Sequence, residues 1–200
     1  MKLYFTPGAC SLAPHIILEE LAITHTLEQV DLKTKTTING IDYLSINEKG
    51  YVPALELDNG HILTEGSVIS QYLADLKPDL NLIPVNGEAR YQLQSLMVFI
   101  STELHKPMGS LFNPKQSHDW KEASTTILSK RLNWLKERLE AQSFLTGEQF
   151  TIADAYLFTV LNWAKLVDFD LTPWPVLISY LERIAKRPAV QQALKVEGLI

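Results

Sequence analysis

The sequence predicts an α/β domain over residues 1–80 and an all-helical domain over residues 88–200, joined by a linker at residues 81–87. Three observations support this fold class. Short β-type runs alternate with helical spacing of apolar residues along the first 80 residues. Two prolines and a glycine then fall within residues 77–87, a composition typical of a linker. Beyond this segment only helical spacing remains.

The first elements form a strand–helix–strand unit. The apolar run at residues 3–5 predicts a strand that ends before the turn at Pro7. Apolar residues at helical spacing predict a helix over residues 12–21, with Pro14 in its first turn, where proline is tolerated. Residues 26–32 alternate in part and predict a second strand. This order predicts a right-handed parallel crossover.

A polar stretch and a hairpin complete the first domain. Residues 33–50 predict nothing regular beyond a short irregular helix near residues 41–44. Asn59-Gly60 separates two apolar runs at residues 52–57 and 61–63, which predicts an antiparallel hairpin. A helix follows over residues 68–76, and polar residues of the kind that cap a helix start precede it.

The second domain reads as a series of helices. Apolar residues recur at helical spacing over residues 88–108, 121–141, 155–163, 174–185 and, more briefly, 188–194. Thr151 is followed three residues later by Asp154, a pattern close to a capping box, with Asp in place of Glu. We therefore expect a helix to begin just after Thr151.

Composition narrows the possible partners and the compartment. The net charge is −5, and no run of Lys and Arg extends beyond residues 33–35, so no nucleic-acid partner is expected. No apolar stretch is long enough to span a bilayer, and residues 1–5 are too few before Pro7 to form a signal peptide. A single cysteine cannot form an internal disulfide, which favours a cytoplasmic location.

Cys10 is the only cysteine and the first candidate functional residue. It precedes the first predicted helix, where the helix dipole and unpaired backbone N–H groups favour an anion. A thiol in this position can have a lowered pKa and greater thiolate character. The alternative is that Cys10 is a small buried hydrophobic residue.

Five motifs, in joint order and spacing, resemble the glutathione transferases and specifically their bacterial beta class, over essentially the whole chain. The resemblance implies a thioredoxin-like N-terminal domain with the order βαβαββα, an all-helical C-terminal domain and a homodimer with a glutathione site between the domains. It implies no metal. The motifs are Pro7-Gly-Ala-Cys10-Ser11-Leu12, Gly50-Tyr-Val52-Pro53-Ala54-Leu55, Leu63-Thr-Glu65-Gly66, Thr102-Glu103-Leu104-His105-Lys106 and Phe150-Thr-Ile-Ala-Asp154-Ala-Tyr-Leu-Phe158.

Within the first domain the resemblance implies contacts to each part of glutathione. Val52, before a cis Pro53, would pair through its backbone with the cysteinyl part as a short added strand. Lys35 matches a lysine that contacts the glycyl carboxylate. The alternatives are an ordinary proline at the start of a strand and a solvated surface lysine.

The start of the following helix would hold the γ-glutamyl group. Glu65 matches an acidic residue of the family, and Gly66 and Ser67 would offer backbone N–H groups to the γ-glutamyl carboxylate. The alternative for Glu65 is a favourable interaction with the helix dipole alone.

The catalytic candidates are Cys10, Ser11 and His105. The resemblance implies that Cys10 lies beside the glutathione sulfur, where beta-class enzymes form a mixed disulfide. Ser11 could donate a hydrogen bond to a thiolate, or it could cap the helix. His105 could favour a thiolate as imidazolium or accept the thiol proton as imidazole, or it could be structural. Further glutathione contacts are implied in the same stretch at Thr102, Glu103 and Leu104.

Two positions depart from the family, and three apolar residues could form a pocket. Phe5 has no hydroxyl at a position where close relatives often carry tyrosine, and Val98 replaces an asparagine of some relatives. Phe112, Trp163 and Leu166 could line a pocket for an apolar co-substrate, or they could be plain core residues.

The sequence is compatible with three functions. The first is conjugation of the glutathione thiol to small apolar electrophiles, which is a detoxification reaction. The second is thiol–disulfide exchange or peroxide reduction through Cys10, for which one cysteine permits only a monothiol route. The third is a non-catalytic carrier of glutathione or apolar ligands.

Overall fold

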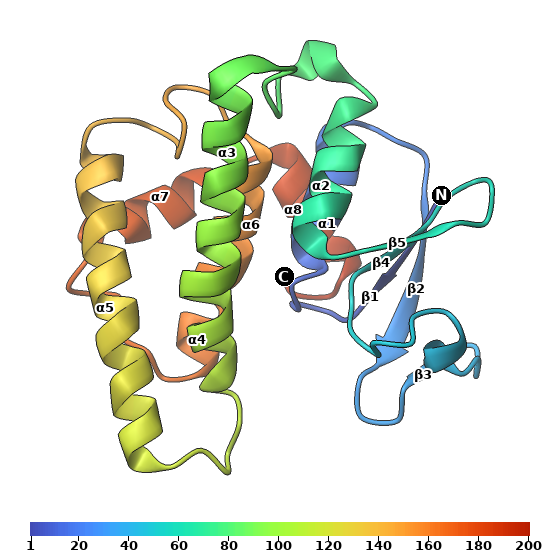
Figure 1. Ribbon diagram of the computed structural model, residues 1–200, viewed down its shortest axis with the longest axis horizontal. Coiled ribbons are helices and arrows are strands. Elements are labelled where there is room, and N and C mark those ends of the chain that lie inside the picture. The colour runs from blue at the N-terminus through green and yellow to red at the C-terminus, as the bar shows by residue number, and fades with distance from the viewer. The chain divides into compact units, whose positions relative to one another are not determined.

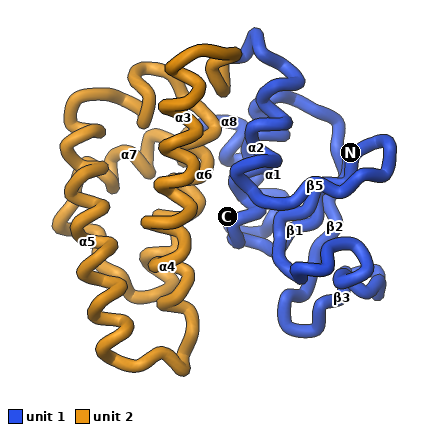
Figure 2. The backbone as a smooth tube through the Cα atoms, in the orientation of Figure 1, with its two compact units in different colours: residues 1–80, 187–200 blue, residues 81–186 orange.

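The computed structural model describes residues 1–200, which form two compact units (Figure 2). Unit 1 contains Met1–Leu80 together with Arg187–Ile200, and unit 2 contains Asn81–Lys186. The segment predicted as a linker belongs to unit 2, where Leu82 and Ile83 are buried. The last helix, predicted within the helical domain, groups with unit 1 instead.

Unit 1 is built on a five-stranded sheet in the order β3-β2-β1-β4-β5 (Figure 1). β1 (Lys2–Phe5) pairs in parallel with β2 (Thr26–Asp31), so the predicted crossover is present. β4 (Ala54–Glu56) and β5 (Ile62–Thr64) form the predicted antiparallel hairpin, with Leu55 opposite Leu63. β3 (Thr36–Thr37) has only two residues, too few to produce a periodic signal in the sequence.

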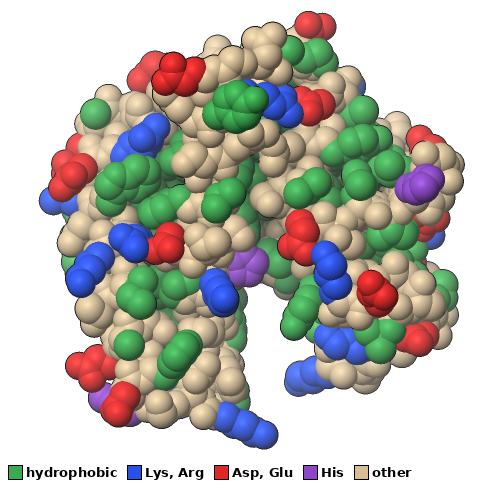
Figure 3. Space-filling view, viewed as in Figure 1, with side chains coloured by type: hydrophobic (Ala, Val, Ile, Leu, Met, Phe, Trp, Pro, Cys, Tyr) green, Lys and Arg blue, Asp and Glu red, His purple; other side chains and the backbone are tan.

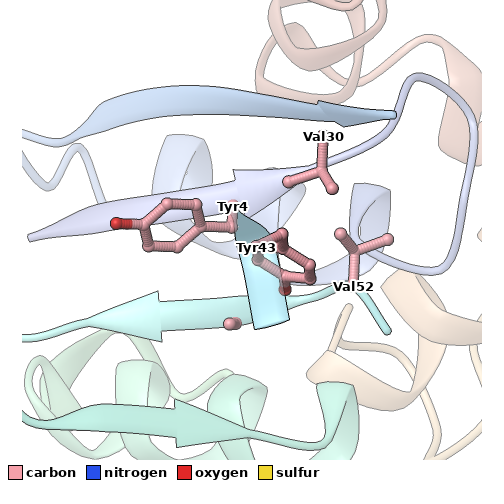
Figure 4. Close-up of a cluster of buried hydrophobic side chains, with 5 residues drawn as sticks. Tyr4, Val30, Tyr43 and Val52 are labelled. Carbon is pink, nitrogen blue, oxygen red and sulfur yellow. The ribbon is translucent and has the colours of Figure 1, made fainter. Parts of the chain in front are cut away.

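Side chains of β1 alternate between the two faces of this sheet. The ring of Phe5 lies 6.3 Å from that of His15 on α1 (Leu12–Glu20). Tyr4 points to the opposite face, where its ring lies 5.8 Å from Tyr43. Figure 4 shows Tyr4 and Tyr43 in one buried cluster with Val30 and Val52. This cluster gives the otherwise polar stretch before Val52 a fixed position.

Three helices of unit 1 pack together. α1 contacts both α2 (Gly66–Asp75) and α8 (Pro188–Val196). Polar contacts reinforce the α8 position, since the Arg187 guanidinium donates to both carboxylate oxygens of Glu20 at 2.6 and 2.9 Å. Short 3-10 turns at Tyr43–Ser45 and Pro78–Leu80 complete the unit.

Replacing Arg187 by alanine should lower the free energy of unfolding by about 1–2 kcal/mol, because it removes a two-pronged, charge-assisted contact that is partly shielded from water. Arg187→Lys should recover only part of this loss, since an ammonium cannot engage both oxygens in the same way. Chemical denaturation followed by circular dichroism measures the effect. Lys136→Ala is the control, because the exposed Lys136–Glu140 pair, at 3.7 Å, should contribute less than about 0.5 kcal/mol. Equal losses in the two variants would contradict the prediction.

Unit 2 contains helices and no strand. The helices are α3 (Gly87–Phe99), a π-helical turn (Ile100–His105), α4 (Lys106–Ser110), α5 (His118–Glu140), α6 (Ile152–Asn162), a 3-10 turn (Ala164–Leu166) and α7 (Pro175–Ala185). α6 is buried from Ile152 through Leu161 and forms the core. No helix of the structure combines the length and hydrophobicity that a membrane span requires.

The capping box at the start of α6 is confirmed. The Thr151 backbone N–H and hydroxyl both donate to the Asp154 carboxylate at 2.8 Å. Asp154 also accepts from the Leu145 backbone N–H and the Tyr180 hydroxyl, each at 2.8 Å. Asp154 is fully buried, so one carboxylate joins a loop, the start of α6 and the middle of α7.

Candidate functional site

The loop before α1 brings two of the predicted site residues together. Cys10 lies immediately before Ser11, the N-cap residue of α1, and its thiol donates to the Val52 carbonyl over 3.1 Å. The Val52–Pro53 peptide bond is cis. A Cβ atom placed on Gly66 would lie 3.5 Å from the Pro53 ring and 4.0 Å from the Cys10 carbonyl oxygen. The start of α2 therefore meets both the Cys10 loop and the Pro53 loop.

The electrostatics of Cys10 differ from the sequence expectation. Burial raises the pKa of the Cys10 thiol to about 11, and the nearby Glu65 carboxylate adds to this effect. The backbone N–H groups of Cys10 and Ser11 lower the pKa, as a helix start should, but they do not offset the loss of hydration. The expectation of a lowered pKa was therefore wrong for the free protein, in which Cys10 is a thiol at neutral pH.

Ser11 is buried within the loop that precedes α1. Its side chain is fully buried, and its hydroxyl donates to the Thr6 carbonyl and accepts from the Thr6 backbone N–H, both at 3.2 Å. It makes no capping hydrogen bond to α1. In this position Ser11 closes the Thr6–Cys10 loop, and it is not placed to donate to a sulfur outside the protein.

At the start of α2, Glu65 is exposed and adopts a positive φ of 70°. Its side chain does not cap the helix but pairs with the Lys49 ammonium at 2.7 Å. The first backbone N–H groups of α2, at Gly66 and Ser67, have no carbonyl partner within the helix, as at any helix start. This end of α2 therefore presents an ion pair beside a site that favours an anion.

Lys35 is half-buried rather than a freely solvated side chain. Its ammonium donates to the Gly50 carbonyl at 2.8 Å and lies 5.6 Å from the centre of the Tyr51 ring. The Tyr51 carbonyl in turn accepts from the Tyr43 hydroxyl and the Asn47 side chain at 2.8 and 2.7 Å. Lys35 is thus held beside the segment that leads into Val52.

In unit 2, His105 ends the π-helical turn Ile100–His105, a type of distortion that is frequent at functional sites. Its Nδ1 atom lies 2.6 Å from the Tyr156 hydroxyl, and its ring meets Trp163 edge-on at 4.8 Å. The centre of the Phe112 ring lies 5.9 Å from that of the Trp163 ring, also edge-on. Burial lowers the pKa of His105, which favours neutral imidazole over imidazolium.

The other predicted residues of this stretch have partners within unit 2. Thr102 donates its hydroxyl to the Val98 carbonyl at 3.0 Å, and Glu103 forms an ion pair with Arg131 at 2.6 Å. Leu104 is completely buried, so its side chain belongs to the core. Leu166 is exposed, whereas Trp163 is buried.

We expect His105 to titrate with a midpoint below 6.5, the usual histidine value, because desolvation disfavours its charged form. The measurement is an NMR titration of the imidazole signals, with His105→Gln to assign them. Because the pKa of His105 is lower in the folded protein than in the unfolded chain, the unfolded chain binds the proton more readily. The free energy of unfolding should therefore fall as the solution is acidified through this midpoint. A midpoint above 6.5 would contradict the prediction.

Two side chains that contact the candidate residues Glu65 and His105 could not be identified from the sequence. Lys49, the partner of Glu65, lies in the polar stretch 33–50, which carries no periodic signal. Tyr156 lies inside the motif at residues 150–158, but its contact with His105 spans 51 residues along the chain. No local pattern identifies such a contact.

Comparisons with known proteins identify the family of the chain. The family model for the N-terminal domain of glutathione S-transferase matches residues 8–76, and that for the C-terminal domain matches residues 99–188. The chain is 48% identical over 200 residues to glutathione S-transferase GstA of Escherichia coli O157:H7, covering 100% of both sequences.

Two solved structures extend the comparison, and each alignment covers 100% of both chains. One is the bacterial beta-class glutathione S-transferase of Sphingomonas chungbukensis, at 44% identity and a TM-score of 0.95. The other is a sphingomonad glutathione S-transferase complexed with glutathione, at 42% identity and a TM-score of 0.95. The chain therefore belongs to the glutathione S-transferase family, a family of transferases, and its resemblance to the bacterial beta class is confirmed.

Proposed function

We propose that the chain conjugates the thiol of glutathione to small apolar electrophiles. The observation that carries the proposal is the meeting, within unit 1, of the Cys10 loop, the Val52–Pro53 segment and the start of α2. These elements match what glutathione requires, namely an exposed backbone edge for its peptide part and a helix start for a carboxylate. A similar protein has been solved as a glutathione complex, which supports the same ligand here.

Each part of glutathione has a proposed partner. The backbone of Val52 pairs with the cysteinyl part. The Lys35 ammonium, which donates to the Gly50 carbonyl in the free protein, binds the glycyl carboxylate. The N–H groups of Gly66 and Ser67 receive the γ-glutamyl carboxylate, and Glu65 receives the γ-glutamyl ammonium. In this arrangement Glu65 exchanges its bond to Lys49 for one to the ligand.

The chemical step forms a C–S bond from the glutathione thiolate to the electrophile and releases the leaving group with its electron pair. Cys10 is proposed to act as a hydrogen-bond donor to this sulfur, since its raised pKa keeps the proton on the thiol at neutral pH. The step uses no metal. His105 is proposed to assist as neutral imidazole, by accepting the proton of the glutathione thiol.

The protonation state of Cys10 also bears on the second candidate function. Thiol–disulfide exchange requires a thiolate on the attacking cysteine. A pKa of about 11 leaves little thiolate at neutral pH, so exchange through Cys10 should be slow compared with conjugation.

The test measures glutathione conjugation to a model aryl halide by absorbance, in the parent protein and in Cys10→Ala. We expect turnover in both, with reduced kcat/KM in the variant, while a mixed disulfide with oxidised glutathione should form only in the parent. If neither protein conjugated glutathione, and the parent formed the mixed disulfide while Cys10→Ala did not, the result would favour the exchange reaction. Binding of glutathione without any turnover would favour a carrier.

A homodimer and a cytoplasmic location complete the proposal. Tyr91, Ser95, Val98 and Thr102 follow one stripe of α3 and its π-helical continuation, and all four are exposed. Tyr91 is 72% exposed and Val98 60%, which is unusual for such side chains and suits an interface with a second copy. Light scattering should give twice the mass of the chain, and Val98→Asp should shift the protein toward monomer.

The single cysteine and the use of reduced glutathione suit the cytoplasm.

A further inference from the structure

A cluster of two histidines and one carboxylate lies in unit 1, on α1 and the turn that follows it. We propose that His15, Glu19 and His25 bind a divalent transition-metal ion of the zinc type. One ligand atom from each lies within 4.8 Å of the others. The site shares no residue with the proposed glutathione contacts, which are Cys10, Lys35, Val52 and the start of α2.

The backbone brings these three side chains together. His15 and Glu19 are four residues apart on α1 and so share one face of the helix, with His15 Nε2 3.8 Å from Glu19 Oε1. The chain then reverses through Ala22, which has a positive φ of 46°. This turn returns His25 to the same face, with its Nε2 3.7 Å from the same Glu19 oxygen.

Hydrogen bonds at the Nδ1 atoms orient both histidines so that their Nε2 atoms are available as metal ligands. His15 Nδ1 lies 2.8 Å from Glu197 Oε1, and His25 Nδ1 lies 2.8 Å from the Ile23 carbonyl. A carboxylate and a carbonyl can only accept, so each Nδ1 carries a proton. In neutral rings both Nε2 atoms then present lone pairs, and they face Glu19. Such outer hydrogen bonds are the usual way in which proteins fix a metal-binding histidine.

His15 Nε2 supplies an independent indication of a missing partner. The His15 side chain is 0% exposed, and its Nε2 atom is buried without a hydrogen bond. Burying a polar nitrogen unpaired costs free energy, and native proteins nearly always satisfy such atoms. A bound cation would satisfy it and would also offset the charges of Glu19 and of Glu197, whose side chain is 0% exposed.

The spacing and donor types select the kind of ion. In a tetrahedral site with bonds of 2.0–2.2 Å, donor atoms lie about 3.4 Å apart. The two contacts to Glu19, at 3.7 and 3.8 Å, need to close by only a few tenths of an ångström. The two imidazole nitrogens lie within 4.8 Å of each other, so they need to close by at most about 1.4 Å. Two imidazole nitrogens and one oxygen favour zinc, cobalt or nickel over magnesium or calcium. Glu19 is 23% exposed and His25 11%, which leaves a route for the ion and for a water as the fourth ligand.

The test uses metal-free protein and titrates it with Co²⁺ and then Zn²⁺. We expect one Co²⁺ per chain with the visible absorption of a tetrahedral site, its displacement by Zn²⁺, and a Zn²⁺-dependent rise in the unfolding temperature. The titration is repeated in a Cys10→Ser background, because a thiol also binds these ions.

Three variants separate the proposed site from other histidines. His25→Ala and Glu19→Gln should each weaken binding at least tenfold, while His61→Ala, which removes an exposed histidine of the same unit, should leave it unchanged. His25 and Glu19 are partly exposed, so their variants should fold, which circular dichroism checks.

Four outcomes would overturn the proposal. They are the absence of Co²⁺ and Zn²⁺ binding, binding that survives His25→Ala and Glu19→Gln together, binding lost in Cys10→Ser, and NMR evidence that His15 Nε2 carries a proton even with excess Zn²⁺. None of these measurements depends on glutathione, so the metal proposal and the proposed function can fail separately.

Discussion

Replacing Asp154 by alanine is expected to lower the free energy of unfolding by about 3–5 kcal/mol, the range for removing the centre of a buried polar network. Four donors meet this carboxylate at 2.8 Å: the backbone N–H groups of Leu145 and Thr151, the Thr151 hydroxyl and the Tyr180 hydroxyl. Alanine would leave these donors without an acceptor in a region closed to water, and each unsatisfied group costs about 1–3 kcal/mol. It would also remove the cap of the buried helix α6.

Urea denaturation followed by tryptophan fluorescence and circular dichroism measures this effect. Asp170→Ala is a matched control, because Asp170 also accepts from a backbone N–H and a hydroxyl, both of Thr172, but lies exposed. The control should lose less than about 1 kcal/mol, as surface substitutions usually do. If both variants lost the same small amount of unfolding free energy, the prediction that the buried Asp154 network stabilises the fold would be contradicted.

Alkylation of Cys10 in the free protein should be slow at neutral pH and should accelerate about tenfold for each pH unit up to pH 10. With a pKa of about 11, the reactive thiolate is about one part in ten thousand at pH 7. The sign is fixed by the cause: burial disfavours the charged form, so the proton leaves only at higher pH.

The rate of reaction with iodoacetamide between pH 6 and 10 tests this, with a small free thiol as the reference. The same thiol in urea-unfolded protein should level off near pH 8.5, the value for an unperturbed cysteine. A rate that levels off below pH 8.5 in the folded protein would show that the helix start outweighs burial, as the sequence alone suggested. Glu65→Gln should raise the folded rate modestly, because it removes a charge that opposes the thiolate.

Local signals in the sequence were sufficient for much of the fold. Asn59-Gly60 located the β4–β5 hairpin, and Thr151 with Asp154 located the start of α6. These patterns work because a tight turn and a helix cap are decided by residues a few positions apart. The apolar residues that predicted α1 belong to a helix that is buried at every position from Leu12 to Leu18.

Properties that depend on distant contacts were not predictable in the same way. The helical spacing at residues 188–194 predicts a short helix but not its packing partner, so the contact of α8 with α1 was missed. The position of Cys10 at a helix start was correct, yet its pKa is decided by groups from other segments that remove water. Ser11 and Leu104 fell within recognisable motifs, but only the structure shows that their side chains face inward.

The discontinuous composition of unit 1 has a consequence for synthesis on the ribosome. Glu197 binds the Gly8 backbone N–H and the His15 ring, both near the beginning of the chain. During translation, all of residues 81–186 emerge before Glu197 exists. Unit 2 can thus form its internal contacts before the Glu197 carboxylate, which binds the beginning of unit 1, has been synthesised.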